Sequence, residues 1–253
     1  MNTKKISISI LAFALAATSA FAWSKKSENL GNLGRMYISV GGGINTSKMK
    51  APATGETSSP TGAVGSFAIN APVFKPGVNA FKDIKWAGVD ASVFFNYSYS
   101  GDYSLGGTSF DFSQYGVGAA LTPYLNFETS LPVLKAIKPF GIAYAGYSWL
   151  DASYGGNNMS DNFFVYGVGG GVEFVILDNL SLTPHWIWHG NAESGMPCYQ
   201  SVGAELSYWF TDQFCFSVFW DHNLGYDYSG ANFKGDLKHG DIIGAKFKIG
   251  FLR

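Results

Sequence analysis

The sequence predicts a single all-β domain, an antiparallel up-and-down barrel of about ten strands that spans a membrane, with eight strands as the alternative. Three observations predict it. Long segments alternate between apolar residues and small or polar ones, which is the period of a β-strand. Aromatic residues make up 17% of the chain and charged residues only 14%, so the apolar excess needs a non-aqueous neighbour. The N-terminus also has the pattern of an export signal.

The clearest alternation lies between residues 161 and 189, where two predicted strands meet at the turn Asp178-Asn179. Aromatic and branched residues such as Phe164 fall on one face, and small or charged residues such as Gly167 fall on the other. A soluble sandwich would pack the aromatic face against a second sheet. A membrane barrel turns that face outward and keeps small and polar groups inside.

The N-terminal residues predict export. Two lysines precede an apolar run over residues 6–17, and Ala20-Phe21-Ala22 supplies the small residues of a cleavage site. We therefore predict a signal peptide over residues 1–22, a polar periplasmic leader over 23–34 and the barrel over 35–253. After the signal, no stretch approaches the roughly 18 unbroken apolar residues of a membrane helix.

The first predicted strand covers residues 36–41, and residues 46–61 form a polar loop rich in Ser, Thr, Pro and Gly. The second strand, residues 67–73, is weaker because it contains Pro72. Residues 128–138 form a connector with a single helical turn, and a bulge follows Tyr144, where the aromatic parity changes. The remaining strands cover residues 84–99, 108–127, 139–152, 161–177, 180–189, 198–210, 213–228 and 239–251.

The connectors and a repeat support a closed barrel. Connectors after even-numbered strands are often tight and those after odd-numbered strands are glycine-rich, as expected of periplasmic turns and outer loops. An even strand count also returns both termini to the periplasmic side. Near copies of one pattern recur on descending strands, each with a glycine inward where a narrow barrel has little room, at residues 115–121, 166–172, 202–206 and 243–247.

The signal peptide, the glycine-rich strands and a closing segment with Phe247, Ile249 and Phe251 together resemble the small outer-membrane β-barrels of Gram-negative bacteria. That group includes the OmpA-like and the opacity-type, porin-like barrels. The resemblance implies an outer-membrane location, contact with outer-membrane lipid, and insertion by the barrel-assembly machinery. That machinery usually reads an aromatic residue at the end of the last strand, whereas Leu252 and Arg253 follow Phe251 here.

Charged and histidine side chains are predicted to face the lumen. Charges inside a narrow barrel are costly unless they are paired. We therefore expect a structural network of ion pairs and water, with a narrow polar path for small solutes as the alternative. The predicted lumen residues are Asp90, Glu173, His185, His189, Glu205, Asp221, Lys246 and Lys248.

Large aromatic residues near both ends of the strands predict two girdles at the lipid headgroups. The alternative interpretation is that these residues are simply the aromatic residues common in β-sheets and form no girdle. The outer set comprises Tyr97, Tyr99, Trp149, Trp186 and Trp188, and the inner set comprises Phe127, Phe140, Phe210 and Phe214.

The two cysteines, Cys198 and Cys215, are predicted to be free thiols. If the hairpin between them turns at Thr211-Asp212, Cys215 lies opposite about Tyr208. Roughly 33 Å of strand then separates the thiols, far beyond the roughly 7 Å Cα separation that a disulfide tolerates.

The expected function is a structural, envelope or surface-interaction role, with neither a catalytic residue nor a cofactor. His185 and His189 lie roughly 13 Å apart along one strand, too far to chelate one metal ion. With a net charge of −1, nucleic acid is not expected as a partner, and a monomer is expected. Two alternatives stay open: an outer-membrane lipid hydrolase using His189, Ser194 and Glu205, and a soluble lipocalin-like carrier with an apolar interior.

Overall fold

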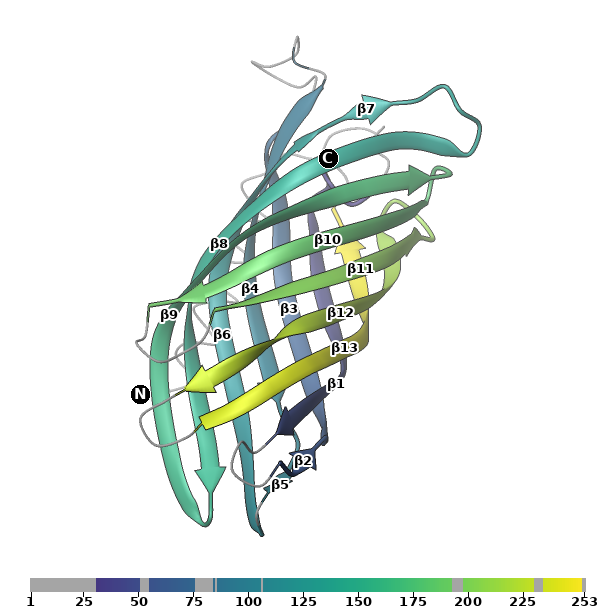
Figure 1. Ribbon diagram of the computed structural model, residues 1–253. Helices are drawn as coiled ribbons and strands as arrows, with labels where there is room; N and C mark the ends of the chain where they lie inside the picture. Colours follow the sequence, from purple (N-terminus) through teal and green to yellow (C-terminus); the bar gives the residue numbers. More distant parts are fainter. Residues whose placement is uncertain are drawn as a thin grey trace.

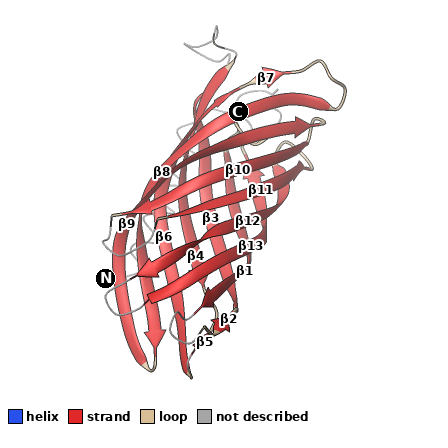
Figure 2. Cartoon of the chain, viewed as in Figure 1, coloured by secondary structure: helices blue, strands red, loops and turns tan. Residues whose placement is uncertain are grey.

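A computed structural model describes residues 31–50, 55–75, 84, 86–105, 107–192, 198–229 and 234–251. The predicted signal peptide and the first part of the predicted leader lie outside the described residues. The described part of the chain is almost entirely strand (Figure 2). It contains no helix that is long and apolar enough to cross a membrane.

Ten strands of the described chain form a closed barrel in which every strand pairs antiparallel with its neighbour in sequence (Figure 1). The last strand pairs with the first, and this contact closes the barrel. The predicted ten-stranded, up-and-down barrel is therefore confirmed, and the eight-stranded alternative is wrong. The barrel strands are β1 (Tyr37–Lys50), β3 (Thr61–Phe74), β4 (Ala87–Tyr99), β6 (Thr108–Leu125), β8 (Leu134–Tyr154), β9 (Asn157–Ile176), β10 (Leu180–Asn191), β11 (Tyr199–Trp209), β12 (Phe214–Ser229) and β13 (Lys234–Gly250).

Three short strands complete the sheet, namely β2 (Thr57–Ser58), β5 (Tyr103–Leu105) and β7 (Phe127–Glu128). Tyr37 at the start of β1 lies opposite Gly250 at the end of β13, so the described chain enters and leaves the barrel at the same end. We call this the terminal end, and the opposite end the far end. The predicted return of both termini to one side agrees with this register.

Several local predictions are wrong. The predicted loop over residues 46–61 is shorter, because β1 continues to Lys50 and β3 begins at Thr61. The connector over residues 128–138 contains β7 and the start of β8 instead of a helical turn. The pairing of β8 with β9 is continuous from Ala136 to Tyr154, so no bulge follows Tyr144. The proline of the second predicted strand is accommodated by a register shift beside it, between Pro72 and Phe74.

The far end is built from long strands more than from long loops. β8 has 21 residues and β9 has 20, and they meet at the two-residue turn Gly155-Gly156. Both glycines have positive φ angles, of 55° and 83°, which residues with a side chain rarely adopt. The β8–β9 hairpin projects with β6 beyond most of the other strands (lower part of Figure 1). The predicted contrast between tight turns and longer outer loops therefore fails at this hairpin.

The outer wall is apolar and the interior is charged. Val40, Ile44 and Phe247 are 56%, 52% and 66% exposed on the outside, whereas Glu173 and Asp90 are fully buried inside. Residues on the outside of a water-soluble barrel would show the opposite distribution. A closed barrel with this distribution is the architecture of outer-membrane proteins, so the lipocalin-like alternative is not supported.

Inward glycines make room for aromatic rings that fill the lumen. A Cβ atom added at Gly118 on β6 would lie 2.6 Å from Cζ of Phe94 and 2.7 Å from the carbonyl oxygen of Ala145. The rings of Phe94 on β4 and Tyr144 on β8, the two strands next to β6, meet edge to face inside the barrel, with centroids 6.0 Å apart. The glycines predicted to face inward therefore lie where large side chains cross the barrel.

Both cysteines are free, as predicted. Cys198 is exposed, and Cys215 is buried on the inner face of β12. Cys215 lies opposite Trp209, one residue from the predicted register. The two thiols therefore report on different environments of the same barrel.

Candidate functional site

The eight predicted lumen residues all lie on inward-facing positions, but they do not form one network. The structure sorts them into separate groups along the lumen. Asp90 and Glu173 lie at the terminal end, next to a group formed by Glu205, Lys246 and Lys248, whereas His185 pairs with Asp221 and His189 contacts other partners.

The terminal end of the lumen is filled by residues 31–35, which we call the plug. These residues precede β1 and turn into the barrel, where Asn32 and Arg35 are buried. The backbone N–H of Asn32 donates to Oε1 of Glu173 at 2.5 Å, and that of Leu33 donates to Oε2 at 3.1 Å. One carboxylate therefore binds two consecutive backbone N–H groups, and hydrogen bonds of this charge-assisted kind are strong.

A second buried carboxylate binds the plug from another strand. The backbone N–H of Gly34 donates to Oδ2 of Asp90 at 2.9 Å. Asn70 on β3 donates through Nδ2 to the same carboxylate at 3.2 Å and to the carbonyl oxygen of Arg35 at 2.9 Å. Two carboxylates on different strands thus hold three backbone N–H groups of the plug.

Lysines and an asparagine complete the plug site. Lys138 on β8 lies 3.8 Å from Oε2 of Glu173 and donates to the carbonyl oxygen of Leu33 at 3.0 Å. Lys248 on β13 donates to Oδ1 of Asn32 at 3.0 Å and forms an ion pair with Glu205. Buried charges are tolerated only when paired and hydrogen-bonded, and these contacts meet that condition.

The plug touches most of the barrel wall. Asn32 also bonds Ser181 on β10, Ser207 on β11 and the indole of Trp209, at 3.3, 3.0 and 3.2 Å. With the contacts above, the five plug residues reach seven of the ten barrel strands. Arg35 stacks on Trp209, with its guanidinium carbon 4.4 Å from the ring centroid.

The predicted leader over residues 23–34 needs correction, because its four described residues lie inside the barrel. The sequence carries one signal for this, the glycines at positions 31 and 34. Their φ angles are 84° and 85°, and a Cβ atom at Gly31 would lie 2.7 Å from the Glu173 carboxylate. The turn into the lumen therefore requires glycine at these positions. Sequence reasoning also missed Lys138 and Asn70.

A further ion-pair group joins Glu205 on β11 to Lys246 and Lys248 on β13. Lys246 donates to Oε2 of Glu205 at 3.0 Å, and Lys248 binds the other oxygen. Ser207 donates to Oε1 of Glu205 at 2.9 Å. One carboxylate thus neutralises part of the charge of two lysines, as the expected structural network requires.

The histidines lie farther from the plug. His185 Nε2 lies 2.7 Å from Oδ1 of Asp221. His189 contacts Tyr144 OH through Nδ1 at 2.6 Å and Ser201 Oγ through Nε2 at 2.9 Å. Both ring nitrogens of His189 are therefore occupied by wall side chains.

The lipid-hydrolase alternative finds no support in this arrangement, because Glu205 is bound by two lysines rather than by His189. Ser194 lies outside the described residues. The adjacent residues Asp221 and His222 do not form a pair with each other. Asp221 pairs with His185, and His222 contacts Asp241 at 3.0 Å. In the described part of the chain, no group of three or more His, Cys, Asp or Glu could hold a metal ion.

A buried aromatic cluster lies on the inner face of β1 and β6 at the far end. Tyr103 on β5 stacks on Phe110, with centroids 5.0 Å apart, and contacts Phe112 at 5.3 Å. Met49 on β1 packs against them, and the Tyr103 hydroxyl bonds Ser47. Burial raises the pKa of the Tyr103 hydroxyl above its usual value, so this group stays neutral. The far end of the barrel therefore has a buried aromatic cluster beside β1 and β6, in addition to the plug at the terminal end.

Most of the predicted girdle residues lie on the outer wall. In the far half, Tyr97 contacts Tyr115, Trp149 contacts Tyr147, and Trp188 contacts Tyr166, with ring centroids 5.1, 5.1 and 5.7 Å apart. Trp186 is exposed on the same belt, and Tyr99 donates its hydroxyl to Asp102. At the terminal end, the exposed members are Phe127, Phe210 and Phe214.

Phe140 is the exception, and its predicted place on the girdle is wrong. It shares the inward parity of Lys138 and Tyr144 on β8, because the predicted bulge is absent. A Cβ atom added at Gly171 on β9 would lie 2.8 Å from Cζ of Phe140. The ring therefore lies over an inward glycine within the lumen.

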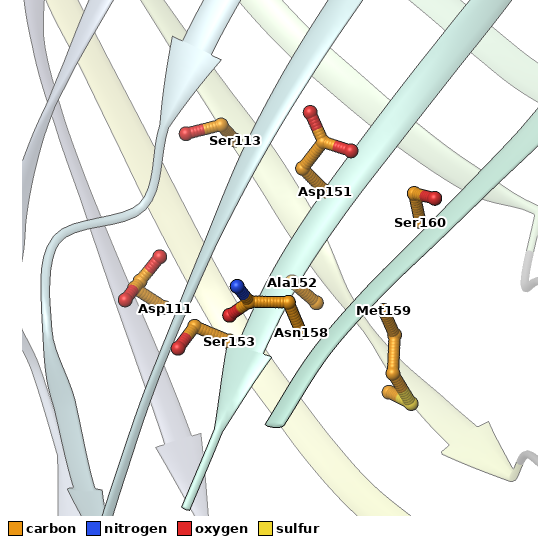
Figure 3. A pocket seen from close by; sticks show the side chains of 8 residues that line it. All are labelled: Asp111, Ser113, Asp151, Ala152, Ser153, Asn158, Met159 and Ser160. Carbon is orange, nitrogen blue, oxygen red and sulfur yellow. The ribbon is translucent and has the colours of Figure 1, made fainter. Parts of the chain in front are cut away.

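A polar hollow of about 400 Å³ lies on the projecting strands at the far end (Figure 3). Its polar side chains come from β6, β8 and β9 and lie opposite one another in register. They comprise Asp111, Ser113, Asp151, Ser153, Asn158 and Ser160. Hydroxyl, amide and carboxylate groups together suit hydrogen bonding to a polar ligand.

No protein-family model matches the chain, and no curated protein matches it in sequence. Among solved structures, the transport unit of the autotransporter AIDA-I from Escherichia coli is similar, with a TM-score of 0.54 and 9% identity, over 92% of this chain and 94% of that one. This likeness shows the shared barrel fold.

Two further solved structures have lower TM-scores. The translocator domain of the autotransporter NalP from Neisseria meningitidis gives 0.42 at 10% identity, over 97% of each chain. Ail, the attachment invasion locus protein of Yersinia pestis, gives 0.36 at 14% identity, over 85% of this chain and 99% of that one.

Proposed function

We propose that this outer-membrane barrel is a sealed structural component of the cell envelope rather than an open diffusion pore. The observation that carries the proposal is the plug, which is buried at the terminal end and contacts seven of the ten barrel strands; the buried Tyr103 cluster narrows the far end beside β1 and β6. Between them, the inward side chains of Phe94, Tyr144 and His189 on β4, β8 and β10 contact one another along the inner wall. These contacts support the proposal that side chains rather than water occupy the axis of a barrel of this size.

Bilayer conductance tests the proposal. We expect the purified, folded barrel to give no steady current steps in a planar lipid bilayer at neutral pH. An open outer-membrane porin in the same lipid would serve as the positive control. Steady, reproducible openings of the unmodified protein would contradict the sealed lumen and favour the narrow-pore alternative.

A surface-interaction role is the second candidate, and the polar hollow on β6, β8 and β9 favours it. Two carboxylates among hydroxyl and amide groups suit a neutral or basic polar ligand such as a carbohydrate. We expect folded barrel to be retained on some immobilised glycans, and retention to fall at least tenfold in an Asp111→Ala, Asp151→Ala double variant. Glu128→Ala, a change at an exposed position at the terminal end, is the control. Equal retention of both variants would exclude the hollow.

The remaining features of the proposal follow from the fold. We propose that the barrel is not an enzyme and acts as a monomer. Its expected partners are outer-membrane lipid along the exposed apolar wall and the barrel-assembly machinery during insertion. Neither a cofactor nor nucleic acid is part of the proposed function.

A further inference from the structure

The terminal end of the lumen has the properties of a peptide-binding site. We infer that its wall binds a turn of peptide backbone, that the chain's own residues 31–35 occupy this site, and that they form a displaceable seal. The inference rests on the sealed lumen proposed above but concerns its terminal end alone. The occupant is a segment of this chain.

The first argument is the kind of contact that holds the plug. Its backbone forms no strand pairing with the wall, and three of its N–H groups donate to side-chain carboxylates of Glu173 and Asp90. Its carbonyl groups at Leu33 and Arg35 accept from Lys138 and Asn70. Side chains of the wall therefore form hydrogen bonds with the backbone N–H and carbonyl groups of the plug, as they would with a bound peptide.

The second argument is that the wall keeps its charge balance without the plug. Glu173 retains Lys138 at 3.8 Å, and Glu205 retains both Lys246 and Lys248. If the plug left, water could solvate these pairs, and no wall lysine would be left without a carboxylate. The ion pair from the plug itself runs from Arg35 to the partly exposed Asp212 at 4.0 Å. A segment that completed the buried ion pairs would be far more costly to remove.

The third argument is that only one plug side chain makes several polar contacts with the barrel strands. Asn32 contacts Ser181, Ser207, Trp209 and Lys248. Arg35 reaches the Asp212 turn, whose carboxylate is partly exposed. The plug is thus held by hydrogen bonds and not by strand pairing, and water can replace each of these bonds when the plug leaves.

The natural cysteines supply the test. Cys215 is 2% exposed and is linked to the plug through Ser217 and Ser207, at 3.6 and 2.8 Å, whereas Cys198 is exposed near the far end. In a Cys198→Ser background, labelling of Cys215 by a charged maleimide measures water access to the lumen beside the plug. The reciprocal Cys215→Ser variant gives the rate for an exposed thiol.

The perturbing variant is Gly31→Val in the full-length chain. Its side chain would meet the Glu173 carboxylate and requires an unfavourable positive φ angle. Gly55→Val is the matched control, because Gly55 also has a positive φ angle but has nothing within 4 Å of an added Cβ atom. We expect Gly31→Val to raise the labelling rate of Cys215 at least tenfold, and Gly55→Val to leave it unchanged.

A peptide add-back tests the binding site itself. The acetylated hexapeptide with the sequence of residues 31–36 should restore protection of Cys215 in the Gly31→Val protein in a saturable manner. The same peptide with proline in place of Leu33 lacks one N–H donor to Glu173, and we expect it to bind about tenfold more weakly. Equal protection by both peptides, or none by either, would overturn the assignment of a peptide site.

Two further variants keep the seal testable if Gly31→Val fails to fold. Asn32→Ala removes the side-chain contacts without altering the wall, and we expect a several-fold faster labelling of Cys215. Ser207→Cys, with both natural cysteines replaced by serine, places a thiol directly against Asn32. If labelling at both reporter positions is as slow with Asn32→Ala as without it, the plug does not control access. Conductance of the unmodified barrel tests the sealed lumen, and cysteine labelling tests the displaceable plug. Either proposal can therefore fail without the other.

Discussion

Replacing Glu173 by alanine is expected to lower the free energy of unfolding by about 3–5 kcal/mol, the cost of removing one partner from a buried ion pair. Glu173 is fully buried, lies 3.8 Å from the equally buried Lys138, and accepts from two backbone N–H groups of the plug. Without it, a buried ammonium loses its counter-ion and two N–H groups lose their acceptor. Equilibrium unfolding in urea, with the barrel in lipid vesicles, measures the loss.

Two comparisons give this prediction its controls. Glu173→Gln keeps the shape and one acceptor oxygen, so its loss should be smaller than that of alanine. Glu128→Ala removes an exposed carboxylate at the same end of the barrel and should change stability by less than about 0.5 kcal/mol. A Glu173→Ala protein as stable as Glu128→Ala would show that the terminal-end pair adds nothing to stability.

Replacing Gly118 by alanine is expected to destabilise the barrel by about 1–3 kcal/mol, the usual cost of overpacking. The added methyl group would lie 2.6 Å from the Phe94 ring and 2.7 and 3.1 Å from backbone atoms of Ala145 and Gly146. The ring can move, but the backbone of the neighbouring strand cannot move without disturbing the β6–β8 pairing.

Gly116 provides a control on the same strand and the same face. An added Cβ atom there has its nearest contact at 4.0 Å, the carbonyl oxygen of Tyr147. Gly116→Ala should therefore be neutral, or more stable by about 0.5–1 kcal/mol, because alanine loses less backbone entropy on folding. Equal unfolding free energies for the two alanine variants would contradict the packing role given to Gly118.

The strands were predictable because their alternation is a local property of the sequence. All ten barrel strands were expected, and even the segment with Pro72 forms a strand. The inward position of charged residues such as Asp90 and Lys248 follows from the same alternation. The free thiols followed from strand length and register alone.

The partners of the inward residues were not predictable, because they depend on contacts between distant strands. The change of aromatic type along β8 suggested a bulge, whereas Phe140 and Tyr144 point inward over glycines of β9. The pairing of His185 with Asp221 joins strands β10 and β12, which are not neighbours. No periodicity within one strand determines such contacts.

The plug was missed for a related reason. Residues 31–35 show neither alternation nor an apolar run, and Asn32 lies 141 residues from Glu173 in sequence. A polar segment before the first strand is expected to lie in water. Only the glycines at positions 31 and 34 departed from that expectation, and their meaning depends on the carboxylates they approach.

The position of Lys248 links sealing to the order of synthesis. Lys248 belongs to β13, the final strand of the barrel, and it contacts Asn32, which precedes the first strand. This contact can form only after the two ends of the sheet have met. A nascent chain that stops before β13 therefore lacks both the closing pair of strands and one contact of the plug, so the proposed seal can form only after β13 has been synthesised.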